Sequence, residues 1–331
     1  MIRRHAALLP LLWATACLLW TTTALAQKSQ WTSEDISLST PTGTLAGTLT
    51  LPRRESGFPL AVIIAGSGPT DRDGNTVGAA TGPASLRLLA EGLAQRGIAS
   101  VRYDKRGIGA SRSAGMRESD LRFEMLADDA AEWVKKHRTD SRFTTITIVG
   151  HSEGSLLGML AAQRAPVDAY VSVAGPARRA DIVLHEQLAT ALPSAMLAES
   201  DSVLARLVGG DTVSRTPKGL DALFRPSVQP YLISWFRYTG TIEIAKLGVP
   251  VLIAQGANDF QVPPAEAAAL ASAAPRAVVV TVVGMNHVLK IAPAERAQQL
   301  QQSYVDPTIP IAPQFLDAVV TFIQRVKPRR S

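Results

Sequence analysis

The sequence predicts an α/β fold in which eight strands form a mostly parallel sheet with helices on both faces. Apolar, β-branched runs typical of buried strands alternate with amphipathic helical segments after about residue 58. This alternation is typical of parallel sheets, because each helix carries the chain back across one face to begin the next strand. It stops only over about residues 176–246, where helical patterns occur without a clear strand. We therefore expect one α/β domain with a helical insertion.

The expected elements can be justified in chain order. Residues 36–39 and 45–51 have the pattern of two strands and are expected as an antiparallel start to the sheet. A helix over 84–96 should end at Gly97, because glycine suits the position that follows a helix. The other expected strands are 60–65, 98–103, 145–149, 169–173, 251–254 and 277–283, and the other helices are 123–137, 155–162, 264–273 and 313–326.

The insertion contains helical patterns at 182–191 and 195–208. We expect it to form a lid that arches over the C-terminal ends of the strands. Its apolar side chains would form a wall of a pocket under this lid or, alternatively, would only pack the insertion onto the core. The side chains concerned are Leu184, Leu188, Leu192, Leu197, Phe224, Trp235, Phe236 and Tyr238.

Residues 1–26 are typical of a secretory signal peptide. Two arginines precede a run that is almost wholly apolar, and the segment ends in Ala-Leu-Ala, a small-residue cleavage signal. The apolar run is shorter than the roughly 18 residues usual for a membrane-spanning helix. We expect cleavage before Gln27, which would leave a domain of residues 27–331 that is periplasmic or secreted and has no stable membrane anchor.

Cysteine content and charge narrow the classes of partner. Cys17 is the only cysteine and lies in the predicted signal peptide, so the predicted mature chain has no disulfide and no cysteine nucleophile. Lipidation of Cys17 is a weaker alternative, because residues 14–16 lack the usual leucine. The net charge of +6 falls to +4 without Arg3 and Arg4. Lysines and arginines are scattered instead of gathered on one element, which argues against a nucleic-acid partner.

The sequence Gly-His-Ser-Glu-Gly at 150–154 matches the G-x-S-x-G pattern of a nucleophile elbow. A strand is expected directly before it and a helix directly after it, which is the setting that this motif requires. Glycines on both sides allow a tight turn that a Cβ would obstruct. Ser152 would then lie at a helix N-terminus, where backbone N–H groups favour negative charge.

His287 and Asp259 are the expected partners of Ser152. His287 follows the last expected strand, and Asp259 follows the strand before it. The chain order Ser, Asp, His is the order that this architecture uses. All three follow C-terminal strand ends, where open α/β sheets hold ligands. A serine needs a base to take its proton, imidazole suits that task, and a carboxylate orients the imidazole.

Four other candidates are assigned structural roles. His137 ends a helix, where a cation suits the helix dipole. His151 lies beside the serine in the elbow and cannot easily face it, and His185 is expected on a helix of the insertion. Asp104 also follows a strand, but it precedes the nucleophile in the chain, and we expect it to organise its own turn beside Arg106.

An oxyanion formed at Ser152 would need two preorganised N–H donors. The amide of Glu153 is expected to be one donor. The glycine-rich loop that begins at Gly66 should supply the other, from Ser67 or, alternatively, from Gly68. This loop lacks the glutamate of a calcium loop and the Gly-Lys-Ser/Thr of a phosphate loop, so neither ligand is expected there.

With these motifs the chain resembles the α/β-hydrolase superfamily over nearly all of its predicted mature length. More narrowly, it resembles bacterial carboxylesterases that are often labelled serine-aminopeptidase-like. Ala65 precedes Gly66 where many relatives have His-Gly, so the hydrogen bonding of this loop must differ. The matching motifs are G-S-G-P-T-D-R-D-G-N at 66–75, D-K-R-G-I-G at 104–109, G-H-S-E-G-S at 150–155, G-A-N-D at 256–259 and N-H at 286–287.

The resemblance implies a serine hydrolase that cleaves small-molecule acyl esters through an acyl-enzyme, without a metal or organic cofactor. Aminopeptidase or amidase, thioesterase and acyltransferase activities are alternatives on the same fold, and a non-catalytic binding protein is disfavoured because every catalytic position is filled. An aminopeptidase would need carboxylates to bind the substrate's α-amino group. The insertion offers Asp181, Glu186, Glu199 and Asp201 for that role.

Overall fold

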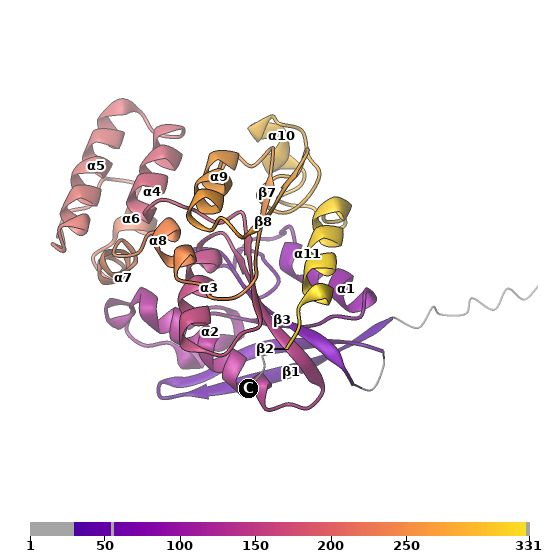
Figure 1. The fold of residues 1–331 in the computed structure, drawn as a ribbon. Helices are drawn as coiled ribbons and strands as arrows, with labels where there is room; N and C mark the ends of the chain where they lie inside the picture. Colours follow the sequence, from indigo (N-terminus) through magenta and orange to yellow (C-terminus); the bar gives the residue numbers. More distant parts are fainter. Residues whose placement is uncertain (1–29, 54–55, 329–331) are drawn as a thin grey trace, which may run out of the picture.

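The computed structural model describes residues 30–53 and 56–328 (Figure 1). The predicted signal peptide and Cys17 lie outside these residues. None of the helices in the described ranges is long and apolar enough to cross a membrane.

The predicted eight-stranded, mostly parallel sheet is confirmed, with the strand order β1-β2-β4-β3-β5-β6-β7-β8. β2 pairs antiparallel with β1 and β4, and the pairs from β4 through β3 to β8 are parallel. The strands are β1 (Trp31–Thr40), β2 (Gly43–Pro52), β3 (Phe58–Ile64), β4 (Ala99–Tyr103), β5 (Phe143–His151), β6 (Ala169–Val173), β7 (Val251–Gly256) and β8 (Val278–Val282).

Helices cover both faces of the sheet, as predicted. Because side chains alternate along a strand, Leu60, Val62 and Ile64 of β3 enter one core while Ala61 and Ile63 enter the other. The first core is covered by α2 (Phe123–Arg138), α3 (Glu153–Arg164) and α9 (Pro264–Ala273). The second is covered by α1 (Ser85–Gln95) and α11 (Pro313–Arg325), which lie together on the opposite side in Figure 1.

The segment predicted as an insertion is helical, and its helices lie above α2 and to the left of α9 in Figure 1. Helices were expected for the first two of its elements, while the short later ones and α10 (Arg296–Gln301) lack a strong sequence pattern. The elements of the insertion are α4 (Ala180–Ala189), α5 (Ser194–Val208), α6 (Asp221–Phe224), α7 (Gln229–Trp235) and α8 (Gly240–Ala245). Its function as a lid stays a prediction.

The aromatic side chains of the insertion pack onto the domain core. Trp235 stacks on Phe123 of α2 with ring centroids 5.6 Å apart, and Tyr231 and Tyr238 also contact the Phe123 ring. Trp235 and Phe236 are both buried. This is the packing alternative named above, and it reflects the large apolar area that aromatic rings remove from water.

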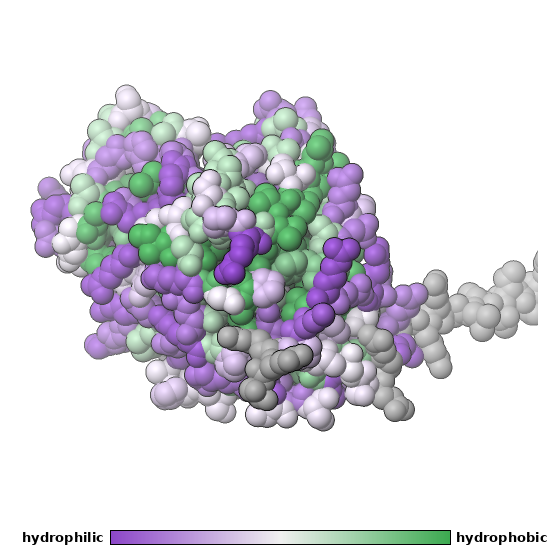
Figure 2. Space-filling model, viewed as in Figure 1, coloured by the Kyte–Doolittle hydropathy of each residue, from purple (hydrophilic) through white to green (hydrophobic). Residues whose placement is uncertain are grey.

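Strand β8 forms one edge of the sheet and leaves apolar side chains in solvent. Val278 and Val279 are about half exposed, and Val283 beyond the strand is more exposed still. Figure 2 shows hydrophobic surface (green) between the regions of α9 and α11.

Candidate active site

Ser152 occupies a sharp turn between β5 and α3, with φ 56° and ψ −124°. The turn is tight enough to exclude side chains at both flanking glycines. A Cβ on Gly150 would lie 2.2 Å from the Gly154 oxygen, and a Cβ on Gly154 would lie 2.3 Å from the Ile64 oxygen. The Ser152 N–H donates to the oxygen of Val173 at 2.9 Å. A non-glycine residue keeps such a backbone only where its surroundings hold it, as they do here.

His287 and Asp259 are joined by a hydrogen bond. Nδ1 of His287 donates to Oδ2 of Asp259 at 2.8 Å, and both side chains are buried. The other carboxylate oxygen accepts the backbone N–H groups of Gln261 at 2.8 Å and Val262 at 2.9 Å. Because a carboxylate only accepts hydrogen bonds, this arrangement places the proton on Nδ1 and leaves Nε2 able to accept one.

Ser152 and His287 line the same cavity of about 240 Å³. Ser67 lines it as well, whereas Asp259 lies behind His287. Gly68 is not among its lining residues, and the Glu153 side chain is buried. The other residues of the wall are mostly small or carry neutral polar groups: Gly66, Thr70, Gly74, Thr76, Thr81, Gly82, Pro83, Ser85, His151, Gln261, Val288 and Tyr304.

His151 contacts the site, although its position beside the serine suggested otherwise. It lines the cavity, and its Nε2 donates to the backbone oxygen of His287 at 2.8 Å. Burial, together with the nearby His287, lowers the pKa of His151 to about 3, so this imidazole is uncharged at neutral pH. It has no carboxylate partner comparable to Asp259, and its contact with the His287 backbone fixes the loop that carries His287.

Asp104 organises its own turn, as expected, although it does not pair with Arg106. Asp104 accepts hydrogen bonds from Arg72, at 2.7 Å from the backbone and 2.9 Å from the guanidinium, and from the Ala110 N–H at 2.8 Å. Arg106 instead pairs with Asp129 of α2 at 2.6 Å. Asp104 therefore organises its turn through a partner in the loop after β3.

His137 is not the cation that its place at a helix end suggested. It is buried, its ring stacks on Trp133 and meets Phe143 edge-on, and burial lowers its pKa to about 4. At neutral pH it is therefore a neutral core residue, because desolvation outweighs the helix dipole. His185 lies on α4 as expected and pairs with Asp201 at 2.6 Å.

None of the four acidic residues of the insertion that were named as candidates lines the cavity, and three of them have cationic or histidine partners within the insertion. Asp181 pairs with Arg179, Glu186 with Arg178, and Asp201 with His185. None of the residues that line the cavity is acidic. Over the described part of the chain, no group of three or more histidine, cysteine or acidic residues is placed to hold a metal ion.

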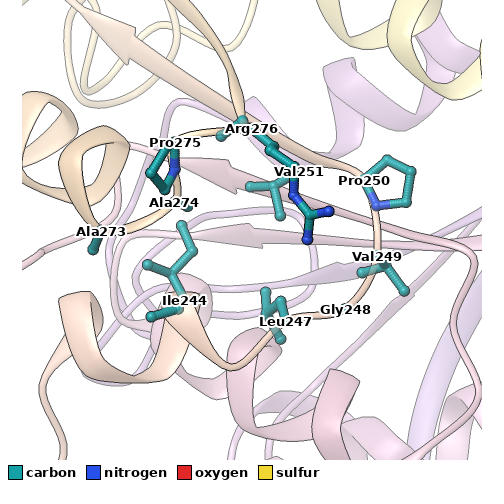
Figure 3. A pocket seen from close by; sticks show the side chains of 12 residues that line it. Ile244, Leu247, Gly248, Val249, Pro250, Val251, Ala273, Ala274, Pro275 and Arg276 are labelled. Atoms are coloured by element: carbon teal, nitrogen blue, oxygen red, sulfur yellow. The ribbon is translucent and has the colours of Figure 1, made fainter.

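A second hollow lies at the other end of the sheet. It measures about 390 Å³ and is lined by residues that precede β7 and β8, mostly apolar and joined by Arg276 (Figure 3). Open α/β sheets bind ligands at the C-terminal ends of their strands. Ser152, Asp259 and His287 all lie at that opposite end, so this hollow is separate from the candidate active site.

An eight-stranded sheet in this order, with a nucleophile elbow leading into a helix, is the architecture of the α/β-hydrolases. The chain has this fold. Residues 84–223 match the family described as "Serine aminopeptidase, S33".

Individual proteins are also similar to this chain. The chain is 30% identical over 221 residues to Esterase EstD of Thermotoga maritima, a match that covers 66% of this chain and 50% of that protein. The chain thus spans about half the length of this relative. The solved structure of Est1E from Butyrivibrio proteoclasticus with ferulic acid bound has a TM-score of 0.56 at 19% identity, covering 87% of this chain and 96% of its own. The solved structure of an esterase from Pyrococcus furiosus has a TM-score of 0.59 at 14% identity, covering 89% of this chain and 91% of its own. At these identities the two structures establish the fold alone.

Proposed function

We propose that this protein is a carboxylic ester hydrolase that works through an acyl-enzyme on Ser152. The observation that carries the proposal is the His287–Asp259 hydrogen bond at the cavity that Ser152 also lines. In this proposal Ser152 is the nucleophile, His287 is the general base and Asp259 orients the imidazole. The backbone N–H groups of Ser67 and Glu153 stabilise the oxyanion, with Gly68 as the alternative to Ser67.

The reaction follows from these positions. As Oγ of Ser152 attacks the ester carbonyl, Nε2 of His287 takes its proton, and Asp259 stabilises the imidazolium. The tetrahedral intermediate collapses when His287 returns that proton to the departing alcohol. Water then attacks the acyl-enzyme with His287 again as the base, and the carboxylic acid leaves with Ser152 restored.

The cavity favours an ester over an aminopeptidase substrate. Binding an α-ammonium group calls for a carboxylate, and none of the lining residues is acidic. The relative from Thermotoga maritima, named an esterase, supports the same choice. Hydroxyl and amide groups on the wall suit a neutral acyl group and the alcohol part of an ester.

A substrate panel tests this proposal. Because the cavity measures about 240 Å³, below the 300–1,000 Å³ common for ligand pockets, we expect nitrophenyl acetate and butyrate to exceed decanoate in kcat/KM by tenfold or more. Aminoacyl nitroanilides and acyl-CoA thioesters in the same assay distinguish peptidase and thioesterase activity. Faster turnover of an aminoacyl nitroanilide than of any ester would refute ester hydrolysis as the main activity.

We further propose that the enzyme is exported and acts in the periplasm or outside the cell. The support is the charged start, apolar run and Ala-Leu-Ala site of residues 1–26. N-terminal sequencing of protein from the host's envelope fraction should give Gln27 as the first residue. An intact Met1 in the cytosol, or a lipid on Cys17, would contradict the proposal.

A further inference from the structure

A buried ion pair lies beside the residues that would bind the oxyanion. Nζ of Lys105, just after β4, is 2.9 Å from Oε2 of Glu153, the first residue of α3, and the two side chains are only 5% and 2% exposed. The same Nζ donates to the backbone oxygen of Gly66 at 2.5 Å. The hydroxyl of Tyr231, on α7 of the insertion, donates to the other oxygen of Glu153. Lys105, Glu153 and Tyr231 are absent from the cavity wall, so these side chains do not act by touching a substrate.

The bond to Gly66 orients the peptide group that carries the Ser67 N–H. A trans peptide is planar, and its N–H points opposite to its C=O. With the Gly66 oxygen held toward Lys105, the Ser67 N–H must point away from it. Both loop residues line the cavity, and a Cβ on Gly66 would lie 3.1 Å from Cβ of Ser152. The bond to Lys105 thus fixes the direction of this N–H in a loop that lies beside the nucleophile.

The pair also holds the residue that carries the second proposed donor. The N–H of Glu153 is among the first amides of α3, which have no acceptor within their own helix. Both carboxylate oxygens of Glu153 are engaged, one by Lys105 and the other by Tyr231. The ammonium group of Lys105 is thus bound to the Glu153 side chain and to the Gly66 oxygen, which belongs to the peptide group that carries the Ser67 N–H.

We propose that Lys105 is a positioning residue that sets the two oxyanion donors, and that Tyr231 connects the insertion to this arrangement. A buried ion pair is a poor source of stability, because desolvation offsets much of the Coulomb attraction and an apolar pair of similar size often serves as well. A positioning role explains why Lys105 and Glu153 are charged, because packing alone would be served by apolar side chains. The inference rests on the ester hydrolysis proposed above.

Two variants test it on the full chain. K105M removes the ammonium group alone, and K105M/E153M/Y231F removes all three polar partners together, so that no buried charge is left unpaired. In both variants we expect kcat for nitrophenyl butyrate to fall about 10²- to 10³-fold, as when one oxyanion donor is lost, with KM changed only several-fold. Inhibition by butylboronic acid, which forms a tetrahedral adduct on a serine, should weaken by a similar factor. The triple variant should keep a Tm near that of the wild type.

R106M is the matched control. Arg106 is the neighbouring residue, and its pair with Asp129 is also buried, at 10% and 4% exposure, but neither residue lines the cavity. This variant should lose Tm while keeping kcat and boronate inhibition. A folded triple variant with wild-type kcat and boronate inhibition would overturn the positioning role, as would an equal loss of kcat in R106M. A wild-type enzyme that neither cleaves the ester nor binds the boronate would instead overturn the proposed function.

Discussion

Replacing Ser152 with alanine should lower kcat for a short nitrophenyl ester by about 10³-fold or more, because only substrate binding and the oxyanion hole then contribute. Alanine keeps the Cβ and removes only Oγ, so the substitution adds no strain to the backbone at φ 56° and ψ −124°. Initial rates give kcat, and an unchanged Tm shows that the loss is chemical.

A covalent probe gives the same prediction a second readout. An organophosphonate should label Ser152 in the wild type and leave S152A unlabelled, as measured by mass spectrometry. Ser155, three residues on, supplies the control, because its hydroxyl bonds to Tyr170 and Ser172 at 2.8 Å each and does not line the cavity. S155A should therefore still be labelled at Ser152. A label at another residue, or S152A with wild-type activity, would remove Ser152 from the mechanism.

Replacing Asp259 with asparagine should lower kcat by about 10⁴-fold while the fold is kept. The asparagine oxygen can still accept the N–H groups of Gln261 and Val262, which Oδ1 of Asp259 accepts now. The amide nitrogen then replaces Oδ2, and it donates where the carboxylate accepted. His287 must turn to the tautomer with its proton on Nε2, which cannot take a proton from Ser152.

Asp104 is the control for this prediction. Its carboxylate binds Arg72 and the Ala110 N–H and takes no part in the His287 contact. D104N should lower Tm and leave kcat within several-fold of the wild type. A severe loss of kcat in D104N together with a mild effect of D259N would show that the acid was assigned to the wrong residue.

Local sequence determines the nucleophile elbow. The close approach at Gly150 is local, because a Cβ there would meet the Gly154 oxygen four residues on, whereas the approach at Gly154 is to Ile64 of β3. The β-branched strand before the elbow and the helix after it are evident from composition. Buried strands and helices with a strong pattern were likewise predictable, such as Ala169–Val173 and Pro264–Ala273, which occur with those bounds. The meeting of Asp259 and His287 follows from topology, because both come just after the ends of neighbouring parallel strands.

Tertiary structure alone decided which charged and aromatic groups meet. Long side chains can reach many partners, and which partner they bind depends on elements far apart in the chain. Arg106 pairs with Asp129 of α2 and not with the nearby Asp104, and Lys105 pairs with Glu153 of α3. Trp235 could have faced a pocket or the core, and only the packing of α7 against Phe123 places it in the core. Sequence patterns of a few residues thus determined the strands, helices and elbow, because those depend on local backbone geometry and alternation of apolar groups. The pairing of buried charges and the lining of the cavity depend on how elements that are separate in the sequence pack against one another.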